Sequence, residues 1–242
     1  MKQRPCKHML NAINARALKR ILGASAIIFS TYFMISYDQG VSAPHFSEQQ
    51  HATSCAFVAN NPSLNVGYAN EIDQHDRVIR FNNFWAKTCV KGPCDDVVGK
   101  KTTDTFLNCH RLIRIEELNP FPWKRCYFDL PPGNWSDNNP DFYSRADLRK
   151  YNCSFIDMKF RREAVSRIVK KAMHIKPDMV NDTLVIYPTT GYLGVMLLSS
   201  SCSGGVTFYG FSNNDTTVWH GHLFEIEHMI LKEKHPNASW FV

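Results

Sequence analysis

The chain shows two kinds of hydrophobic pattern, one continuous and one interrupted. Residues 21–37 form an apolar run without a charged side chain, and a run of this length is at the short end of what spans a bilayer core of ~30 Å. From residue 55 onward the apolar stretches are short and alternate with polar or turn-forming residues, as in a domain that buries a core. The pattern therefore predicts a transmembrane segment ahead of one globular domain.

The charges around the apolar run predict its orientation. Residues 1–20 contain six Lys and Arg side chains and no Asp or Glu, which predicts a cytoplasmic basic tail with the rest of the chain on the lumenal side. Residues 38–54 are polar and lack periodicity, which predicts a stem. We therefore expect a type II signal anchor over 21–37 and a lumenal domain over 55–242; a cleaved signal peptide is the alternative.

Within the predicted domain, the spacing of apolar residues indicates both strands and helices. Short or alternating apolar runs predict strands at 54–58, 76–81, 183–187 and 206–211. Apolar residues at helical spacing predict helices at 159–175 and 192–201. Residues 119–158 contain five prolines and are expected to be irregular and exposed. This mixture is typical of an α/β domain.

One strand–turn–helix unit is expected to present unpaired backbone N–H groups. Pro188, Thr189, Thr190 and Gly191 lie between the strand predicted at 183–187 and the helix that follows. The first N–H groups of a helix have no intrahelical acceptor and lie at the positive end of its dipole, so such a turn favours an anion. An ordinary capping turn is the alternative interpretation.

The charge balance argues against a nucleic-acid partner. The 242-residue chain has a formal net charge of +6 and is 44% hydrophobic. The six cations of the basic tail account for this excess, because the other 22 Lys and Arg residues match 22 Asp and Glu residues. A neutral domain lacks the basic footprint that nucleic acids require.

Cysteines and glycosylation sequons agree with a lumenal domain. Seven cysteines follow residue 37 and none forms a C-x-x-C pair, a usage typical of disulfides rather than of structural zinc. Because seven is odd, at least one of them is free or bonds to another chain. Five N-x-S/T sequons follow the anchor and favour a glycosylated protein; they begin at Asn134, Asn152, Asn181, Asn214 and Asn237.

Four short motifs, taken in their order along the chain, resemble a known family. They are Cys55-Ala-Phe-Val-Ala-Asn60 with the segment up to Asn82, Val98-Gly-Lys-Lys-Thr-Thr103, Pro188-Thr-Thr-Gly191 with Cys202 and Tyr209-Gly-Phe211, and His220-Gly-His-Leu-Phe-Glu225. They resemble the sialylmotifs of the eukaryotic-type sialyltransferases, glycosyltransferase family 29. The resemblance implies a Rossmann-like variant of the GT-A fold with a mostly parallel sheet.

The resemblance implies a donor site in the two larger motifs. Asn60 and Asn82 match the asparagines that hold the CMP part of the donor, and an amide both donates and accepts hydrogen bonds without adding charge. Thr189, Thr190 and Gly191 match the turn that lies against the donor nucleotide and sugar. These five residues are therefore the expected donor-binding residues.

The resemblance also implies a disulfide and a catalytic base. Cys55 and Cys202 match the disulfide that joins the large and small motifs. His220 matches the general base that takes the proton of the acceptor hydroxyl. His222 shares the H-x4-E spacing, because Glu227 follows it as Glu225 follows His220. The residues around His220 favour it as the base, and His222 is the other candidate.

The function that the resemblance implies is an inverting transfer of sialic acid, or a related acid sugar, from a CMP donor to a hydroxyl of a glycan acceptor. The acceptor would be carried by a glycoprotein or glycolipid at the Golgi membrane. No D-x-D sequence follows residue 37, so the usual metal–nucleotide clamp is not expected, and neither is a metal or another cofactor.

Three alternatives fit the same residues. The donor could instead be CMP-Kdo, which the motifs do not separate from CMP-sialic acid. The segment between Phe211 and His220 lacks the histidine of the family's third motif, as in a catalytically weak, membrane-anchored binder of glycans or nucleotide sugars. The pair His220 and His222, with Glu225 or Glu227, also has the composition of a two-histidine, one-carboxylate metal site.

Overall fold

The computed structural model describes residues 52–59, 67–82, 98–108, 123–129, 140–177, 186–211 and 222–241. The basic tail, the anchor predicted at 21–37 and the stem lie outside these residues. In the described part of the chain, no helix has both the length and the apolar character needed to cross a membrane. The anchor therefore stays a prediction.

Seven strands in the described ranges form one sheet in the order β5-β4-β3-β2-β1-β6-β7, and each neighbouring pair is parallel. The strands are β1 (Cys55–Val58), β2 (Arg77–Phe81), β3 (Asp104–Asn108), β4 (Arg125–Asp129), β5 (Cys153–Phe155), β6 (Val206–Tyr209) and β7 (Ser239–Phe241). Strands that are covered on both faces read as continuous apolar runs, and every residue of β1 and β2 is buried. The predicted α/β fold with a mostly parallel sheet is thereby confirmed.

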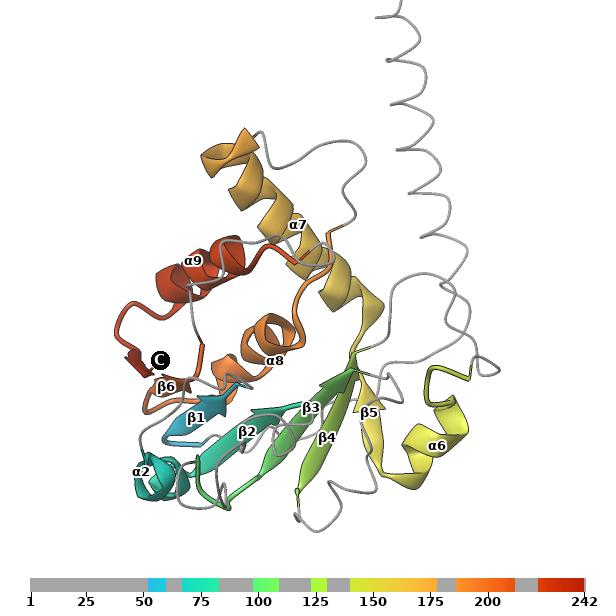
Figure 1. Cartoon of the computed structure of the whole chain (residues 1–242), viewed down its shortest axis with the longest axis vertical. Helices are drawn as coiled ribbons and strands as arrows, with labels where there is room; N and C mark the ends of the chain where they lie inside the picture. The colour runs from blue at the N-terminus through green and yellow to red at the C-terminus, as the bar shows by residue number, and fades with distance from the viewer. Residues whose placement is uncertain are drawn as a thin grey trace, which may run out of the picture. The chain divides into compact units, whose positions relative to one another are not determined.

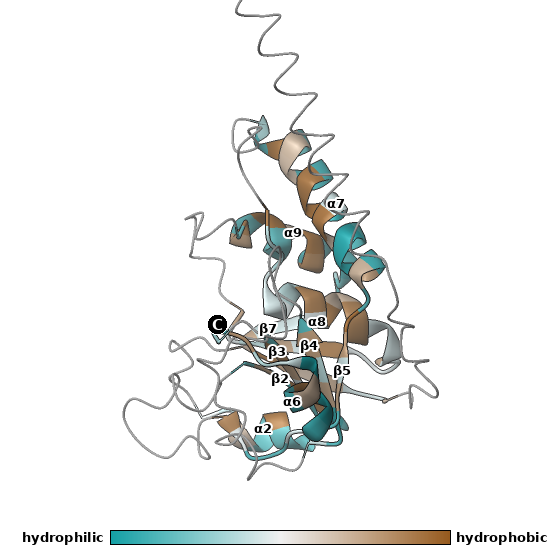
Figure 2. Cartoon of the chain, turned by 90° about the vertical axis from the view of Figure 1, so that its right-hand side faces the viewer, coloured by the Kyte–Doolittle hydropathy of each residue, from teal (hydrophilic) through white to brown (hydrophobic). Residues whose placement is uncertain are grey.

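Helices cover both faces of the sheet (Figure 1). Helices α7 (Met158–Ile175), α8 (Thr190–Leu198) and α9 (Phe224–Lys234) lie on one face. Helices α2 (Ala69–Gln74) and α6 (Arg145–Lys150) lie on the other. Figure 2 shows that α8, the helix nearest the sheet on the first face, is mostly hydrophobic. Such a helix fits a position between the sheet and a second layer of helices.

The alternation of side chains along β1 divides the core between the two faces. Cys55 and Phe57 belong to the cluster under α7, α8 and α9. Ala56 and Val58 belong to the cluster that contains Ile72 of α2. Both helical layers thus depend on the same short central strand.

Helix α7 confirms the helix predicted at 159–175. Its N-cap Asp157 accepts a hydrogen bond from the backbone N–H of Lys159 at 2.7 Å, which satisfies one of the donors left over at a helix start. Its buried residues recur every three or four positions, and they are Arg161, Ala164, Ile168 and Ala172.

Two expectations about the elements were wrong. The region 119–158, expected to be irregular, contains β4, α6 and β5. A disulfide between Cys126 and Cys153 joins β4 to β5; its pairing could not be derived from the sequence. The strand predicted at 183–187 is described only at Ile186 and Tyr187, and neither residue is in a strand.

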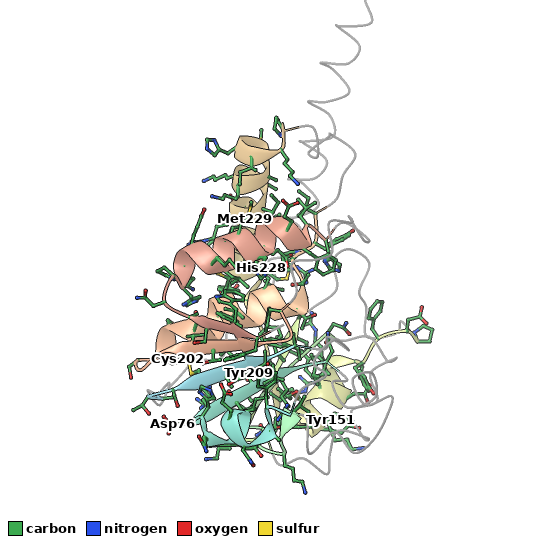
Figure 3. All side chains as sticks on the ribbon, turned by 60° about the vertical axis from the view of Figure 1, so that its left-hand side comes forward. Asp76, Tyr151, Cys202, Tyr209, His228 and Met229 are labelled. Atoms are coloured by element: carbon green, nitrogen blue, oxygen red, sulfur yellow. A yellow bond between two sulfur atoms is a disulfide. The ribbon has the colours of Figure 1, made fainter. Side chains whose placement is uncertain are left out.

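The amino ends of the strands are cross-linked by a disulfide and a buried ion pair. Cys55 and Cys202 form the disulfide that the family resemblance implies, with their Cα atoms 5.8 Å apart; Cys202 is labelled in Figure 3. Next to it, Arg77 donates from Nε and Nη2 to Asp104 at 2.8 and 2.6 Å, and also to the hydroxyl of Ser201. Both partners of the ion pair are at most 2% exposed, so this edge of the sheet is held rigidly.

Substituting Asp104 tests how much this ion pair contributes. Asp104→Asn keeps the size of the side chain but leaves the buried Arg77 charge without its carboxylate. It also removes the 3.2 Å pair between Arg125 and the same carboxylate. We expect a loss of about 3–5 kcal/mol in the free energy of unfolding, mostly from Arg77 because it is the buried partner. Urea denaturation measures it. The control is Glu233→Gln, which removes an ion pair with Lys171 whose carboxylate is 61% exposed, and it should change stability by no more than about 0.5 kcal/mol. Equal effects of the two substitutions would contradict the structural role of Asp104.

Candidate functional site

The sheet changes its winding direction at β1. From this strand the chain order continues through β2 on one side, whereas β6 lies on the other. In open parallel sheets, ligands bind beyond the carboxyl ends of the strands at such a switch point. Asn82 directly follows β2 and Phe211 lies two residues beyond the end of β6. Both therefore lie at the edge where a ligand is expected.

Asn82 is held in an unusual backbone conformation. Its φ is +51°, which lies in the left-handed region that asparagine tolerates better than most residues. Its N–H donates to the carbonyl of Phe106, and its Oδ1 accepts from the N–H of Asn108, both at 2.9 Å. The side-chain oxygen is thus used within the protein. The amide N–H2 group makes no hydrogen bond to the described residues, so Asn82 can offer its two N–H donors to a ligand.

The predicted turn at Thr189 and Gly191 does begin a helix, and it lies at the same edge of the sheet. A Cβ atom on Gly191 would stand 3.3 Å from Cε1 of Phe211, so this position accommodates a larger residue only if the ring moves. The Phe211 ring packs edge-on against Phe81 at 5.9 Å and Phe208 at 5.3 Å between centroids. Phe211 therefore connects the turn to the ends of β2 and β6.

The turn caps α8 and leaves donors available. The side chain of Thr189, the N-cap residue, accepts from the N–H of Tyr192 at 3.0 Å. The N–H groups of Thr190 and Gly191 make no hydrogen bond to the described residues, as expected for the first positions of a helix. They lie at the positive end of the helix dipole, so the turn suits an anionic group.

Two residues near the C-terminus, His222 and Glu227, contact the turn and the residue that precedes it. The carboxylate of Glu227, in α9, accepts from the N–H of Thr189 at 2.8 Å and lies 2.6 Å from its hydroxyl oxygen. His222 Nδ1 lies 2.7 Å from the carbonyl oxygen of Tyr187. The two contacts fall on either side of Pro188, so His222 and Glu227 both position the turn.

The contact of His222 fixes its tautomer. A carbonyl oxygen only accepts hydrogen bonds, so Nδ1 must carry the proton in its bond to Tyr187. In the neutral ring, Nε2 is then the nitrogen that can take up a proton. This is the form that a general base requires.

Glu227 is buried at 4% exposure. Burial raises its pKa from 4.5 to about 8, and the two bonds from Thr189 act in the opposite direction. Near neutral pH the group therefore carries little negative charge. A neutral carboxyl behind the turn repels an incoming anion far less than a carboxylate would.

The remaining predicted residues are Asn60, His220 and the acidic residues of the alternative metal site. Asn60 and His220 lie outside the described residues. The carboxylate of Glu225 pairs with Lys176, and that of Glu227 contacts Thr189, so both acidic residues of the alternative metal site face other partners. Within the described ranges, no group of three His, Cys, Asp or Glu side chains could hold a metal ion.

Sequence reasoning missed the parts played by several residues. Tyr187 supplies the carbonyl that orients His222, Asn108 holds the Asn82 amide, and Phe211 packs against the turn. Tyr187 and Asn108 act through their backbone, which no side-chain pattern reveals. For Glu227 the signal was present in the second H-x4-E spacing.

Comparisons with known proteins find a likeness to sialyltransferases over part of the chain. Residues 17–124 match the model of glycosyltransferase family 29 (sialyltransferase). The curated β-galactoside α-2,6-sialyltransferase 2 of Danio rerio is 26% identical over 160 residues, which cover 62% of this chain and 30% of that protein. The chain thus spans less than a third of its curated relative. The family resemblance read from the motifs is confirmed by the sequence match.

Solved sialyltransferase structures show a more distant likeness. A mammalian sialyltransferase in complex with Gal-β-1,3-GalNAc-ortho-nitrophenol is 18% identical, with a TM-score of 0.44 over 78% of this chain and 68% of that one. The monofunctional α-2,3-sialyltransferase Cst-I of Campylobacter jejuni is 13% identical, with a TM-score of 0.47 over 83% and 80%. These scores are too low to transfer any detail of a site.

The Glu227 contact predicts how stability depends on pH. Because the pKa of Glu227 is raised from 4.5 to about 8 on folding, its contribution is fully present below pH 4.5 and is lost as the pH rises to 8. We expect the wild type to lose on the order of 3–5 kcal/mol over this range relative to Glu227→Gln, which does not titrate.

Urea denaturation of both proteins at several pH values measures this difference. Asp129, whose pKa burial raises to about 6, is common to both and cancels. A difference that stays constant from pH 4.5 to 8 would show that Glu227 does not titrate as described.

Proposed function

Since residues 17–124 match the glycosyltransferase family 29 (sialyltransferase) model, we propose that the chain is a sialyltransferase-like enzyme. It transfers an acid sugar from a CMP donor to a hydroxyl of a glycan acceptor. The observation that carries the proposal is the junction at the carboxyl edge of the sheet, where the turn at Thr189 is held by Glu227 and lies against Phe211. That edge joins an anion-binding helix start to the strand ends that border the switch point.

The donor would bind with its phosphate near the turn. The N–H groups of Thr190 and Gly191 can donate to phosphate oxygens. The N–H2 group of Asn82 can donate to another acceptor of the nucleotide, as proposed also for Asn60. Donors that stabilise the negative charge of the departing CMP accelerate the reaction, because that charge increases in the transition state.

The transfer would proceed by one displacement. The acceptor oxygen forms a bond to the anomeric carbon while the bond from that carbon to the phosphate oxygen breaks, and CMP leaves with the electron pair. A histidine accepts the proton of the acceptor hydroxyl, which contributes roughly 10²–10⁴ in rate. A single displacement inverts the anomeric centre. His222, with its proton held on Nδ1, and His220 are the two candidates for the base.

No metal or other cofactor is part of the proposal. CMP carries a single phosphate, and the sequence has no D-x-D clamp after residue 37. The positive end of the α8 dipole and the N–H groups of the turn supply the electrostatic attraction instead.

We place this activity at the lumenal face of the Golgi membrane, behind a type II anchor at 21–37. Disulfides persist in oxidising compartments, and Cys55–Cys202 and Cys126–Cys153 support this placement. The acceptor glycan would be carried by a glycoprotein or a glycolipid.

A binder without turnover is the second candidate. The segment between Phe211 and His220 has no histidine that could assist the leaving phosphate. Such a protein would bind CMP and the CMP-sugar donor but would neither transfer the sugar to an acceptor nor hydrolyse the donor.

A donor assay on the full chain tests both the function and the base. We expect transfer to β-galactoside acceptors from CMP-sialic acid or CMP-Kdo. Substituting the base should reduce kcat by roughly 10²–10⁴ and leave the affinity for CMP nearly unchanged. His222→Asn keeps a donor for the Tyr187 carbonyl, so it removes the proton acceptor with little disturbance of the turn; His220→Asn is the matched variant.

The outcomes separate the candidates. A wild type that neither transfers nor hydrolyses either donor excludes the enzyme and leaves the binder. Full activity in both histidine variants would show that neither residue is the base.

A further inference from the structure

The hydroxyl of Thr189 stands between two groups and has only one proton to donate. Its Oγ1 accepts from the N–H of Tyr192 at 3.0 Å and lies 2.6 Å from Oε2 of Glu227. A carboxylate accepts hydrogen bonds only, whereas a protonated carboxyl also donates one. The protonation state of Glu227 therefore decides which way the hydrogen bond between these two side chains runs.

The two states offer different surfaces to a ligand. When Glu227 is ionised, the Thr189 hydroxyl must donate to it, and its proton points away from any ligand. When Glu227 is protonated on Oε2, it donates to Thr189 Oγ1. The threonine O–H then no longer donates to Glu227 and can donate a hydrogen bond to another acceptor. This O–H group lies at the same helix start as the N–H groups of Thr190 and Gly191, which are also hydrogen-bond donors.

We propose that Glu227 is a proton-linked positioning residue: an anionic group of the donor binds at the turn together with the uptake of one proton by Glu227, and the Thr189 hydroxyl turns to the ligand. This inference rests on the proposed CMP-sugar site. No covalent bond changes except that the Glu227 carboxylate gains a proton from solvent. In the same step, the Thr189 hydroxyl becomes a hydrogen-bond donor to the ligand, and the negative charge of Glu227 that would repel the ligand is neutralised.

The surroundings of Glu227 set the pH at which this exchange matters. Tyr192 of α8 interacts electrostatically with Glu227 and with Arg167 of α7. His228 follows Glu227 on α9. Burial raises the pKa of Glu227 to about 8 and lowers that of His228 to about 4. His228 is therefore neutral above pH 7, so among these neighbours Glu227 is the group that titrates between pH 7 and 9. Binding should weaken as the pH rises through this range.

Calorimetric titration of the full chain with CMP tests the linkage. The phosphate of CMP titrates near pH 6, so between pH 7.5 and 9.5 its own charge is constant. At pH 9, in buffers of different ionisation enthalpy, the wild type should take up about one proton per CMP bound. Its affinity should fall up to about tenfold per pH unit above the pKa of Glu227.

Two variants isolate the groups involved. Glu227→Gln presents a permanent N–H donor to Thr189, so it should bind CMP with no proton uptake through this site and with an affinity that varies little from pH 7.5 to 9.5. Thr189→Ser keeps the hydroxyl and the cap and should retain the linkage.

The results distinguish this inference from the proposed function. CMP binding in which the wild type and Glu227→Gln take up the same number of protons would overturn the role of Glu227 and leave the nucleotide site intact. No CMP binding by the folded wild type at any pH would overturn both.

Discussion

The arrangement of the site depends on how α8 is fixed along its whole length. At its start, Glu227 of α9 holds the capping residue Thr189. In its middle, Gly194 lies so close to Phe81 that a Cβ atom there would stand 2.4 Å from the ring, so the helix rests directly on the sheet. Beyond its end, the disulfide of Cys202 and the bond from Arg77 to Ser201 hold the chain to the amino edge. Only a helix fixed in this way keeps its first N–H groups aimed at one place beyond the strands.

The amino and carboxyl edges of the sheet therefore differ in function: the first stabilises the fold and the second carries the candidate site. The amino edge carries the disulfide and the buried pair of Arg77 and Asp104, whose groups are fully used within the protein. The carboxyl edge carries groups that keep a donor for a ligand, such as the Asn82 amide and the start of α8. Because α8 runs from the second edge to the first, cross-links at the amino edge stabilise the geometry of the site without occupying it.

Much of this was readable in the sequence, for physical reasons. A short apolar run predicted β1 and an alternating run predicted β2. The turn pattern predicted the helix start at Thr189–Gly191, and the family resemblance implied the disulfide partners Cys55 and Cys202. Region 119–158 was misjudged because its prolines concealed three short elements, and β7 is only three residues long. The contacts of Asn82 and His222 run to backbone atoms of Asn108 and Tyr187, which are distant in the chain. Those contacts arise only from the tertiary fold.

The central claim, that the carboxyl edge beside β1 is a CMP site, is tested most directly by calorimetric titration of the full chain with CMP beside Asn82→Asp. An aspartate retains the left-handed backbone and can still accept from the N–H of Asn108, but it replaces the N–H2 donor by a negative oxygen. We predict that the wild type binds CMP and that the folded variant binds about tenfold or more weakly, because the anion is repelled and loses a donor. Equal affinities, or no binding by the wild type, would contradict the account.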